Sequence, residues 1–124
     1  MIWVVSDHQE TRDALVPLIA AIQYQVAAID CGDEVVKRLR FQITSLIIVD
    51  CGLPDSFHLI AKIRSHPRSA TTPIVMFSTD SQDLKEKALL RGADAYVPKG
   101  SLDWAELLDE VRRFAGPPSS THEA

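Results

Sequence analysis

Cysteine is scarce in this 124-residue sequence, which contains two, Cys31 and Cys51. Two cysteines without a Cys-x-x-Cys spacing supply neither a zinc site nor a disulfide framework. Cys51 directly follows a strongly apolar stretch, so we expect a free thiol, which suits the reducing cytoplasm. The cysteine content therefore argues against a small disulfide-stabilised secreted domain and favours a cytoplasmic location.

An excess of positive charge is also missing, because 13 Lys and Arg residues stand against 17 Asp and Glu residues, for a net charge of −4. Binding to phosphates of nucleic acids requires a local excess of Lys and Arg, so we expect no direct nucleic-acid partner. The apolar runs have the length of strands, and the opening stretch MIWVVSDHQE lacks the basic region and long apolar run of a signal peptide. We therefore expect no membrane partner.

Apolar residues, at 46% of the chain, are sufficient for the core of one domain. Five short apolar runs alternate with amphipathic stretches of helical spacing, and continuous apolar runs are typical of strands covered on both faces. The predicted strands are 2–5, 26–29, 46–49, 74–77 and 95–97, and the predicted helices are 11–24, 33–41, 57–64, 81–91 and 101–114. This alternation predicts an α/β three-layer sandwich with a parallel five-stranded sheet.

The domain is expected to span residues 1–115. Residues 116–124 are polar and contain two prolines, so we expect a disordered tail or the start of a linker to a further domain. Pro17 removes a backbone donor inside the first predicted helix and should kink it, at a cost of roughly 3 kcal/mol against a straight helix.

Polar side chains follow the predicted strands at the point where each strand ends. In a doubly wound sheet the active site lies outside the carboxyl ends of the strands, where the strand order reverses. Asp7, Asp50, Ser78 and Lys99 stand at such ends, whereas Asp30, after the second strand, is expected at the sheet edge and away from the site. Paired carboxylates can hold Mg²⁺, and a carboxylate can attack phosphorus to give an aspartyl phosphate. A lysine and a hydroxyl can then stabilise the phosphoryl oxygens.

In this order the residues resemble the receiver domain of two-component response regulators, on the stretches LIIVDCGLP, PIVMFST and RGADAYVPK. The resemblance implies a flavodoxin-like (βα)5 fold, doubly wound, with strand order 2-1-3-4-5. It also implies a role for each matching residue: phospho-acceptor and metal ligand for Asp50, direct metal ligand for Asp7, metal binding through the backbone carbonyl for Gly52, switch hydroxyl for Ser78, phosphoryl contact for Lys99, and switch aromatic for Tyr96.

The function implied by this resemblance is a signalling switch of a phosphorelay and not an enzyme. Asp50 would be phosphorylated with Mg²⁺ by a histidine kinase or phosphotransfer protein. The signal would leave through the face formed by the fourth helix, fifth strand and fifth helix, toward a downstream output protein or a further domain.

Three residues depart from the pattern of the family. Ser6 stands where an acid is usual, so we expect weaker Mg²⁺ binding. His58 replaces a frequent glycine. Gly100 replaces the proline that commonly follows the lysine in a cis peptide. A cis bond before a non-proline residue costs about 2.5–4 kcal/mol. We therefore expect a trans bond between Lys99 and Gly100, or a displaced Lys99. These departures motivate an alternative, a pseudo-receiver that serves as an interaction module without being phosphorylated.

Other readings of the same residues remain open. Asp50 could be a capping or loop aspartate, Asp7 could cap the first helix, and Ser78 could simply begin a turn. The histidines at 8, 58, 66 and 122 lack metal-ligand spacing and are expected on the surface, with His8 as the exception, since its position allows it to face the pocket mouth. Trp104 is expected on the last helix and in the core, with a partner-facing anchor as the alternative.

Two further activities on the same topology fit less well. A haloacid-dehalogenase-type phosphatase needs a second aspartate two residues after the first, and Gly52 occupies that place. A flavin mononucleotide site would need a phosphate-binding loop after the first strand, where the acids Asp7 and Glu10 would repel phosphate.

Overall fold

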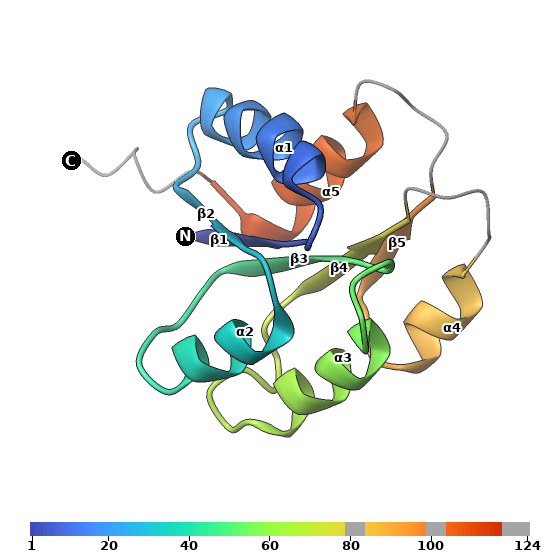
Figure 1. Ribbon diagram of the computed structural model, residues 1–124. Coiled ribbons are helices and arrows are strands. Elements are labelled where there is room, and N and C mark those ends of the chain that lie inside the picture. Colours follow the sequence, from blue (N-terminus) through green and yellow to red (C-terminus); the bar gives the residue numbers. More distant parts are fainter. Residues whose placement is uncertain (79–83, 99–103, 118–124) are drawn as a thin grey trace.

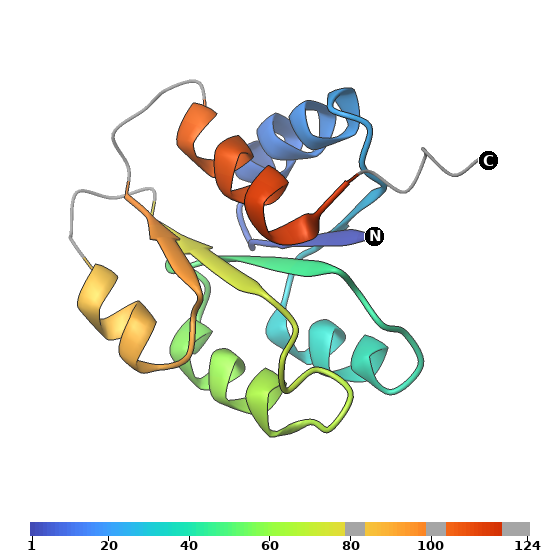
Figure 2. The same ribbon diagram turned by 180° about the vertical axis from the view of Figure 1, so that it is seen from behind.

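The computed structural model describes residues 1–78, 84–98 and 104–117, in which strands and helices alternate. The elements are β1 (Ile2–Val5), α1 (Gln9–Ala21), β2 (Val26–Ile29), α2 (Gly32–Leu39), β3 (Leu46–Asp50), α3 (Ser56–Ser65), β4 (Ile74–Phe77), α4 (Lys85–Leu90), β5 (Ala95–Val97) and α5 (Ala105–Ala115). The strands form one parallel sheet in the order β2-β1-β3-β4-β5. Helices α1 and α5 cover one face and α2, α3 and α4 cover the other (Figure 1 and Figure 2). The predicted doubly wound sandwich is confirmed.

Apart from the partly exposed edge strand β2, the sheet is buried on both faces, which explains why its strands are continuous apolar runs in the sequence. Every residue of β1, β3 and β4 is buried. Alternate side chains of the same strands enter different halves of the core. Trp3, Ile47 and Met76 pack on the side of α2–α4. Val4, Ile48 and Phe77 pack on the side of α1 and α5.

The helices are displaced from their predicted bounds by one to four residues. α1 ends at Ala21, three residues earlier than predicted, and Gln23 adopts a left-handed backbone with φ of 76°. The helix continues through Pro17, which lies on its exposed side. The predicted caps Ser81 and Ser101 lie outside the described residues. These boundaries depend on how each turn packs, which amphipathic spacing does not encode.

Trp104 corrects one expectation. It precedes α5 instead of lying within it, with a left-handed φ of 63°. Its ring meets that of Phe77 edge-on, with 5.4 Å between centroids, and packs against the core under α1 and α5. The expected core role is confirmed, while the position on the helix was wrong.

Arg64 on α3 ties together the segments at the amino ends of β4 and β5. Its guanidinium donates to the carbonyl of Thr72 at 2.6 Å and to that of Gly92 at 2.8 Å, and it pairs with Asp94 at 2.8 Å. Asp94 also accepts the backbone N–H of Ile74 at 2.8 Å. This network stands at the opposite end of the sheet from the carboxyl ends of the strands, so its role is structural.

Both cysteines are reduced, as expected; Cys31 is exposed and Cys51 is half-buried. Within residues 1–78, 84–98 and 104–117, no helix has the length and apolar character needed to cross a bilayer.

Candidate functional site

The strand order reverses between β1 and β3, so the crevice outside the carboxyl ends of these two strands is where a doubly wound fold places its site. The strands run parallel with Val5 beside Val49, which brings the next residues, Ser6 and Asp50, side by side. Asp50 is the last residue of β3, and both it and Ser6 are fully buried. The predicted acceptor therefore lies at the switch point of the sheet.

Among the described residues, two donors hold the Asp50 carboxylate, one at each oxygen. The hydroxyl of Ser6 donates to Oδ2 at 2.8 Å, and the backbone N–H of Gly52 donates to Oδ1 at 2.9 Å. Ser6 Oγ also accepts the N–H of His8 at 3.2 Å. A buried carboxylate needs such donors to offset its desolvation. The donors fix the orientation of the carboxylate toward the crevice.

Ser6 has a role that sequence reasoning missed. From the sequence, Ser6 was interpreted only as the replacement of a usual acid. The structure shows that it is a buried donor, hydrogen-bonded to the predicted acceptor Asp50. The signal that could have revealed it is the parallel pairing of the first and third strands, which places Ser6 beside Asp50. A hydroxyl can donate to a carboxylate, and an ionised acid cannot.

Asp7 and His8 lie at the mouth of the crevice. Their side chains are 39% and 59% exposed, and His8 Nε2 is 3.7 Å from Asp7 Oδ1. The N-cap of α1 is His8 and not Asp7, so the capping alternative for Asp7 was wrong. Asp7, His8 and Asp50 each offer a ligand atom, and these atoms lie within 4.8 Å of one another. The expectation that His8 faces the pocket mouth is therefore confirmed.

This donor set fits a divalent cation. Two carboxylates converge, and hard cations such as Mg²⁺ are held by one or two carboxylates with waters completing the shell. Gly52 leaves the space open, since a Cβ at this position would stand 3.3 Å from Asp50 Oδ1. The structure shows the N–H of Gly52 bonded to Asp50, while the role expected for its carbonyl remains a prediction.

Ser78 and Tyr96 connect the crevice to β5 and α4. Ser78 follows β4, is 4% exposed, and donates its backbone N–H to Val97 at 3.1 Å. The side chain of Tyr96 is buried, and its hydroxyl accepts the N–H of Leu84, just before α4, at 3.3 Å. Tyr96 is thus in an inward orientation. Lys99 and Gly100, with the peptide bond predicted between them, lie outside the described residues.

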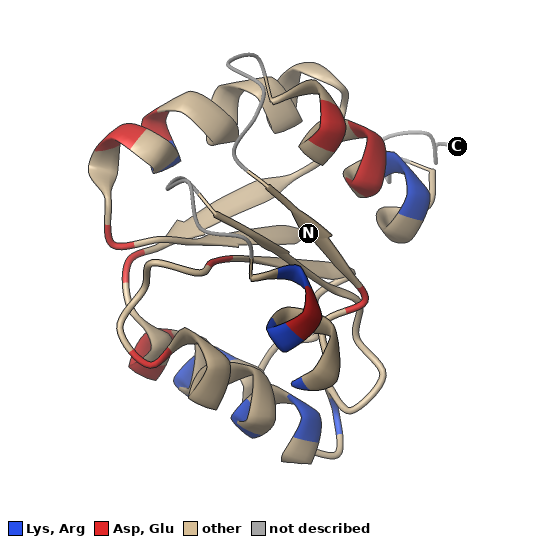
Figure 3. Cartoon of the chain, turned by 90° about the vertical axis from the view of Figure 1, so that its right-hand side faces the viewer, with Lys and Arg blue, Asp and Glu red and all other residues tan. Residues whose placement is uncertain are grey.

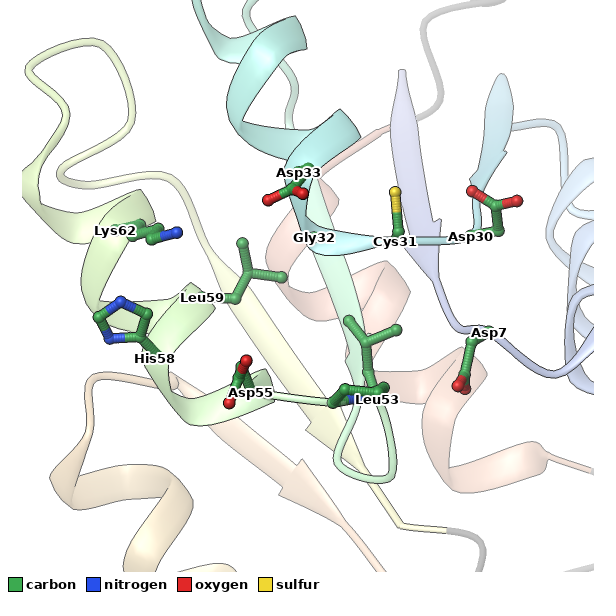
Figure 4. Close-up of a pocket in the computed structure, with 11 residues that line it drawn as sticks. Asp7, Asp30, Cys31, Gly32, Asp33, Leu53, Asp55, His58, Leu59 and Lys62 are labelled. Carbon is green, nitrogen blue, oxygen red and sulfur yellow. The ribbon is translucent and has the colours of Figure 1, made fainter.

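An acidic pocket of about 320 Å³ adjoins the crevice between β1, α2 and α3 (Figure 4). Four acids line it, Asp7, Asp30, Asp33 and Asp55, together with one lysine, Lys62, and with His58 on the exposed side of α3. Asp30 does lie after the edge strand β2, as expected, yet it shares this pocket with Asp7. Figure 3 shows acidic segments at this edge of the sheet, whereas basic segments lie mostly along the helices of the lower layer. The surroundings of the site therefore favour a cation.

Comparison with known proteins gives the family. The model of the response regulator receiver domain matches residues 2–112. The transcriptional regulatory protein GltR of Pseudomonas aeruginosa is 36% identical over 101 residues, 79% of this chain and 42% of that protein. The transcriptional regulatory protein CreB of Escherichia coli is 30% identical over 102 residues, 79% of this chain and 43% of that protein. The chain thus spans less than half the length of these relatives.

Solved structures show the same fold. The receiver domain of the sensor histidine kinase PA1611 from Pseudomonas aeruginosa, with a magnesium ion coordinated in its active-site cleft, has a TM-score of 0.81 at 24% identity and covers 93% of this chain and 96% of that one. The chemotaxis response regulator CheY4 of Vibrio cholerae has a TM-score of 0.80 at 22% identity, covering 91% and 96%. From the family match and the arrangement of its strand-end residues, this chain belongs to the receiver domain family of two-component response regulators.

Proposed function

We propose that this receiver domain is phosphorylated on Asp50 in a Mg²⁺-dependent reaction and acts as a signalling switch. The observation that supports this most is the fully buried Asp50 carboxylate, held by donors from Ser6 and Gly52 and facing a second acid, Asp7. Such an arrangement presents an oriented nucleophile beside a cation site at the switch point of the sheet.

The transfer requires little from the protein beyond orientation and charge. A carboxylate oxygen of Asp50 forms the bond to phosphorus, and the bond from phosphorus to the donor atom breaks, with that electron pair leaving on the donor. The donor is the phosphohistidine of a kinase or phosphotransfer protein, from which histidine leaves, or acetyl phosphate, from which acetate leaves. Asp7, Asp50 and the Gly52 carbonyl would hold Mg²⁺, which neutralises charge on the phosphoryl oxygens. Ser78 and Lys99 are proposed to contact those oxygens.

The conformational response would run through β4 and β5. Ser78 is tied by its N–H to Val97, and Tyr96 is tied by its hydroxyl to the start of α4. A shift of Ser78 toward a phosphoryl group would therefore displace β5 and alter the bond between Tyr96 and Leu84. The face formed by α4, β5 and α5 would change for a downstream protein or for a further domain.

The test is phosphorylation by acetyl phosphate with Mg²⁺, followed by intact mass measurement. Wild type should gain one phosphoryl group, and Asp50→Asn should gain none. Asp30→Asn is the matched control, because Asp30 also follows a strand and lines the adjoining pocket but is not part of the cluster of Asp7, His8 and Asp50. It should be phosphorylated like wild type. A wild type that gains no mass, or an Asp50→Asn variant that gains as much, would overturn the proposal.

A second candidate, a pseudo-receiver that is not phosphorylated, is favoured by one observation. The Ser6 hydroxyl replaces an acid and occupies one oxygen of Asp50. If Mg²⁺ at millimolar concentration causes no change in the NMR signals of Asp7 and Asp50, the pseudo-receiver is the better description. In either case we propose a cytoplasmic location, which suits the two reduced cysteines.

A further inference from the structure

His8 is the side chain at the crevice whose contacts are not explained by the proposed phosphorylation. It occupies the N-cap of α1, yet its side chain makes no capping hydrogen bond. The backbone at this residue is extended, with φ of −94° and ψ of 115°. A Cβ at Gly52 would lie 4.0 Å from His8 Nε2 and 3.3 Å from Asp50 Oδ1. The imidazole and the acceptor carboxylate therefore border the same small space.

The spacing suits coordination of one ion by three side chains. Carboxylate and imidazole ligands lie about 2.0–2.2 Å from a transition metal, so two ligand atoms on the same ion can be roughly 4.4 Å apart at most. His8 Nε2 and Asp7 Oδ1 are 3.7 Å apart, and the atoms of all three residues fall within 4.8 Å. The exposed side chains of Asp7 and His8 can rotate to close the remaining gap. Their exposure also leaves positions for water.

The chemistry of this donor set differs from that of an all-oxygen site. Ser6 adds only a neutral hydroxyl, which is already bonded to Asp50. Mg²⁺ prefers oxygen ligands and loses water reluctantly, so an imidazole adds little to its binding. Imidazole suits Zn²⁺, Ni²⁺ and Co²⁺, which also exceed Mn²⁺ in general affinity for nitrogen and oxygen sites.

We propose that His8 is a direct ligand of the metal site at Asp50, and that it makes this site favour transition ions such as Co²⁺ and Ni²⁺ over Mg²⁺. This inference rests on the proposed function, because it assumes that the cation binds at Asp7 and Asp50. It adds a nitrogen ligand and a metal preference to that site.

The test compares Co²⁺ and Mg²⁺ binding at one fixed pH by calorimetry, with the d–d absorption of Co²⁺ and the paramagnetic shift of imidazole protons as structural readouts. His8→Gln removes the imidazole and keeps a polar side chain. His58→Gln is the matched control, since His58 is an exposed histidine in the adjoining acidic pocket. Asp50→Asn reports whether the bound ion is at the proposed site.

Removal of His8 should lower Co²⁺ affinity on the order of tenfold or more, because even residues beyond the direct ligands typically contribute 10–100-fold to metal affinity. Mg²⁺ affinity should change little, and His58→Gln should match wild type for both ions. The His8 ring protons should shift strongly in the Co²⁺ complex.

Three results would overturn the inference: equal Co²⁺ affinity in wild type and His8→Gln, an equal loss of Co²⁺ and Mg²⁺ binding, or a thiolate-to-cobalt charge-transfer band that assigns the ion to a cysteine. If these occur while wild type is still phosphorylated on Asp50 with Mg²⁺, only the role of His8 fails. If Asp50→Asn binds both ions as well as wild type does, the cation is elsewhere, and both the inference and the metal site of the proposed function fail.

Discussion

Ser6→Asp tests the link between the stability of the domain and its cation site. Ser6 is fully buried and donates to Asp50 at 2.8 Å. An aspartate at this position would restore an acidic pair with Asp7, but it would also remove the donor and place a second carboxylate against Asp50. We therefore expect the variant to be less stable than wild type without a divalent cation and to be stabilised by Mg²⁺ more than wild type is.

The magnitude follows from two contributions. A hydrogen bond to a charged group is worth about 1.5–3 kcal/mol. Two like charges roughly 4 Å apart repel by about 4 kcal/mol at an effective dielectric constant near 20, which is an upper limit because the new side chain can rotate away from Asp50 toward the crevice. With about half of this upper limit taken for the repulsion, the two contributions together predict a loss of about 3.5–5 kcal/mol in the free energy of unfolding. Domains of this size are typically stable by about 5–15 kcal/mol, so the variant should still fold.

The assay is urea unfolding with a chelator and again with saturating Mg²⁺. Ser6→Ala is the matched control, because it removes the hydrogen bond without adding charge. It should lose about 1.5–3 kcal/mol and gain no more from Mg²⁺ than wild type does. For Ser6→Asp, tighter binding to the folded state should raise stability by the linkage relation and recover part of the loss. The reasoning is refuted if Ser6→Asp is as stable as wild type in chelator, or if Mg²⁺ stabilises all three proteins equally.

Two further predictions concern the scaffold. Arg64→Ala should lower the free energy of unfolding by about 2–3 kcal/mol, because the guanidinium joins Gly92 and Asp94 to α3. The control Arg68→Ala removes one exposed hydrogen bond and should change the free energy of unfolding by less than about 0.5 kcal/mol. Urea denaturation would measure both, and equal losses would contradict this account. Trp3→Phe should change stability by no more than about 1 kcal/mol, since the cavity left by the smaller ring is offset by removal of an indole N–H that is buried without a partner among the described residues. A loss above roughly 2 kcal/mol in the same assay would show that this N–H is satisfied in solution.

The two ends of the sheet have different roles. At the amino ends of β4 and β5, Arg64 fixes the turns with several hydrogen bonds. At the carboxyl ends, polar residues converge on a crevice lined by exposed acids. In a doubly wound fold the functional site lies at the carboxyl ends of the strands, because loops there can vary without disturbing the core. Arg64→Ala should therefore lower stability while leaving the phosphorylation of Asp50 intact in the folded fraction.

The fold could be predicted from the sequence because its signal is local and repeated. The buried run from Leu46 to Val49 has no polar face, so it must be covered on both sides, and the helical spacing between such runs supplies the covering helices. The positions of Asp7, Asp50 and Ser78, each at the end of a strand, could equally be predicted from the sequence. Parallel strands point the same way, so their carboxyl ends meet at one edge whatever the details of packing.

What only the tertiary structure decided is how the side chains at that edge meet. Ser6 and Asp50 are 44 residues apart, and their hydrogen bond exists because the register of β1 on β3 sets them side by side. His8 faces Asp7 and Gly52 because the chain enters α1 in an extended conformation at this residue. Registers and loop paths depend on packing between distant segments, which no local pattern encodes. The sequence thus determined that Asp7, Asp50 and Ser78 stand at the ends of their strands, and packing determined that Asp50 is held by a serine and accompanied by a histidine.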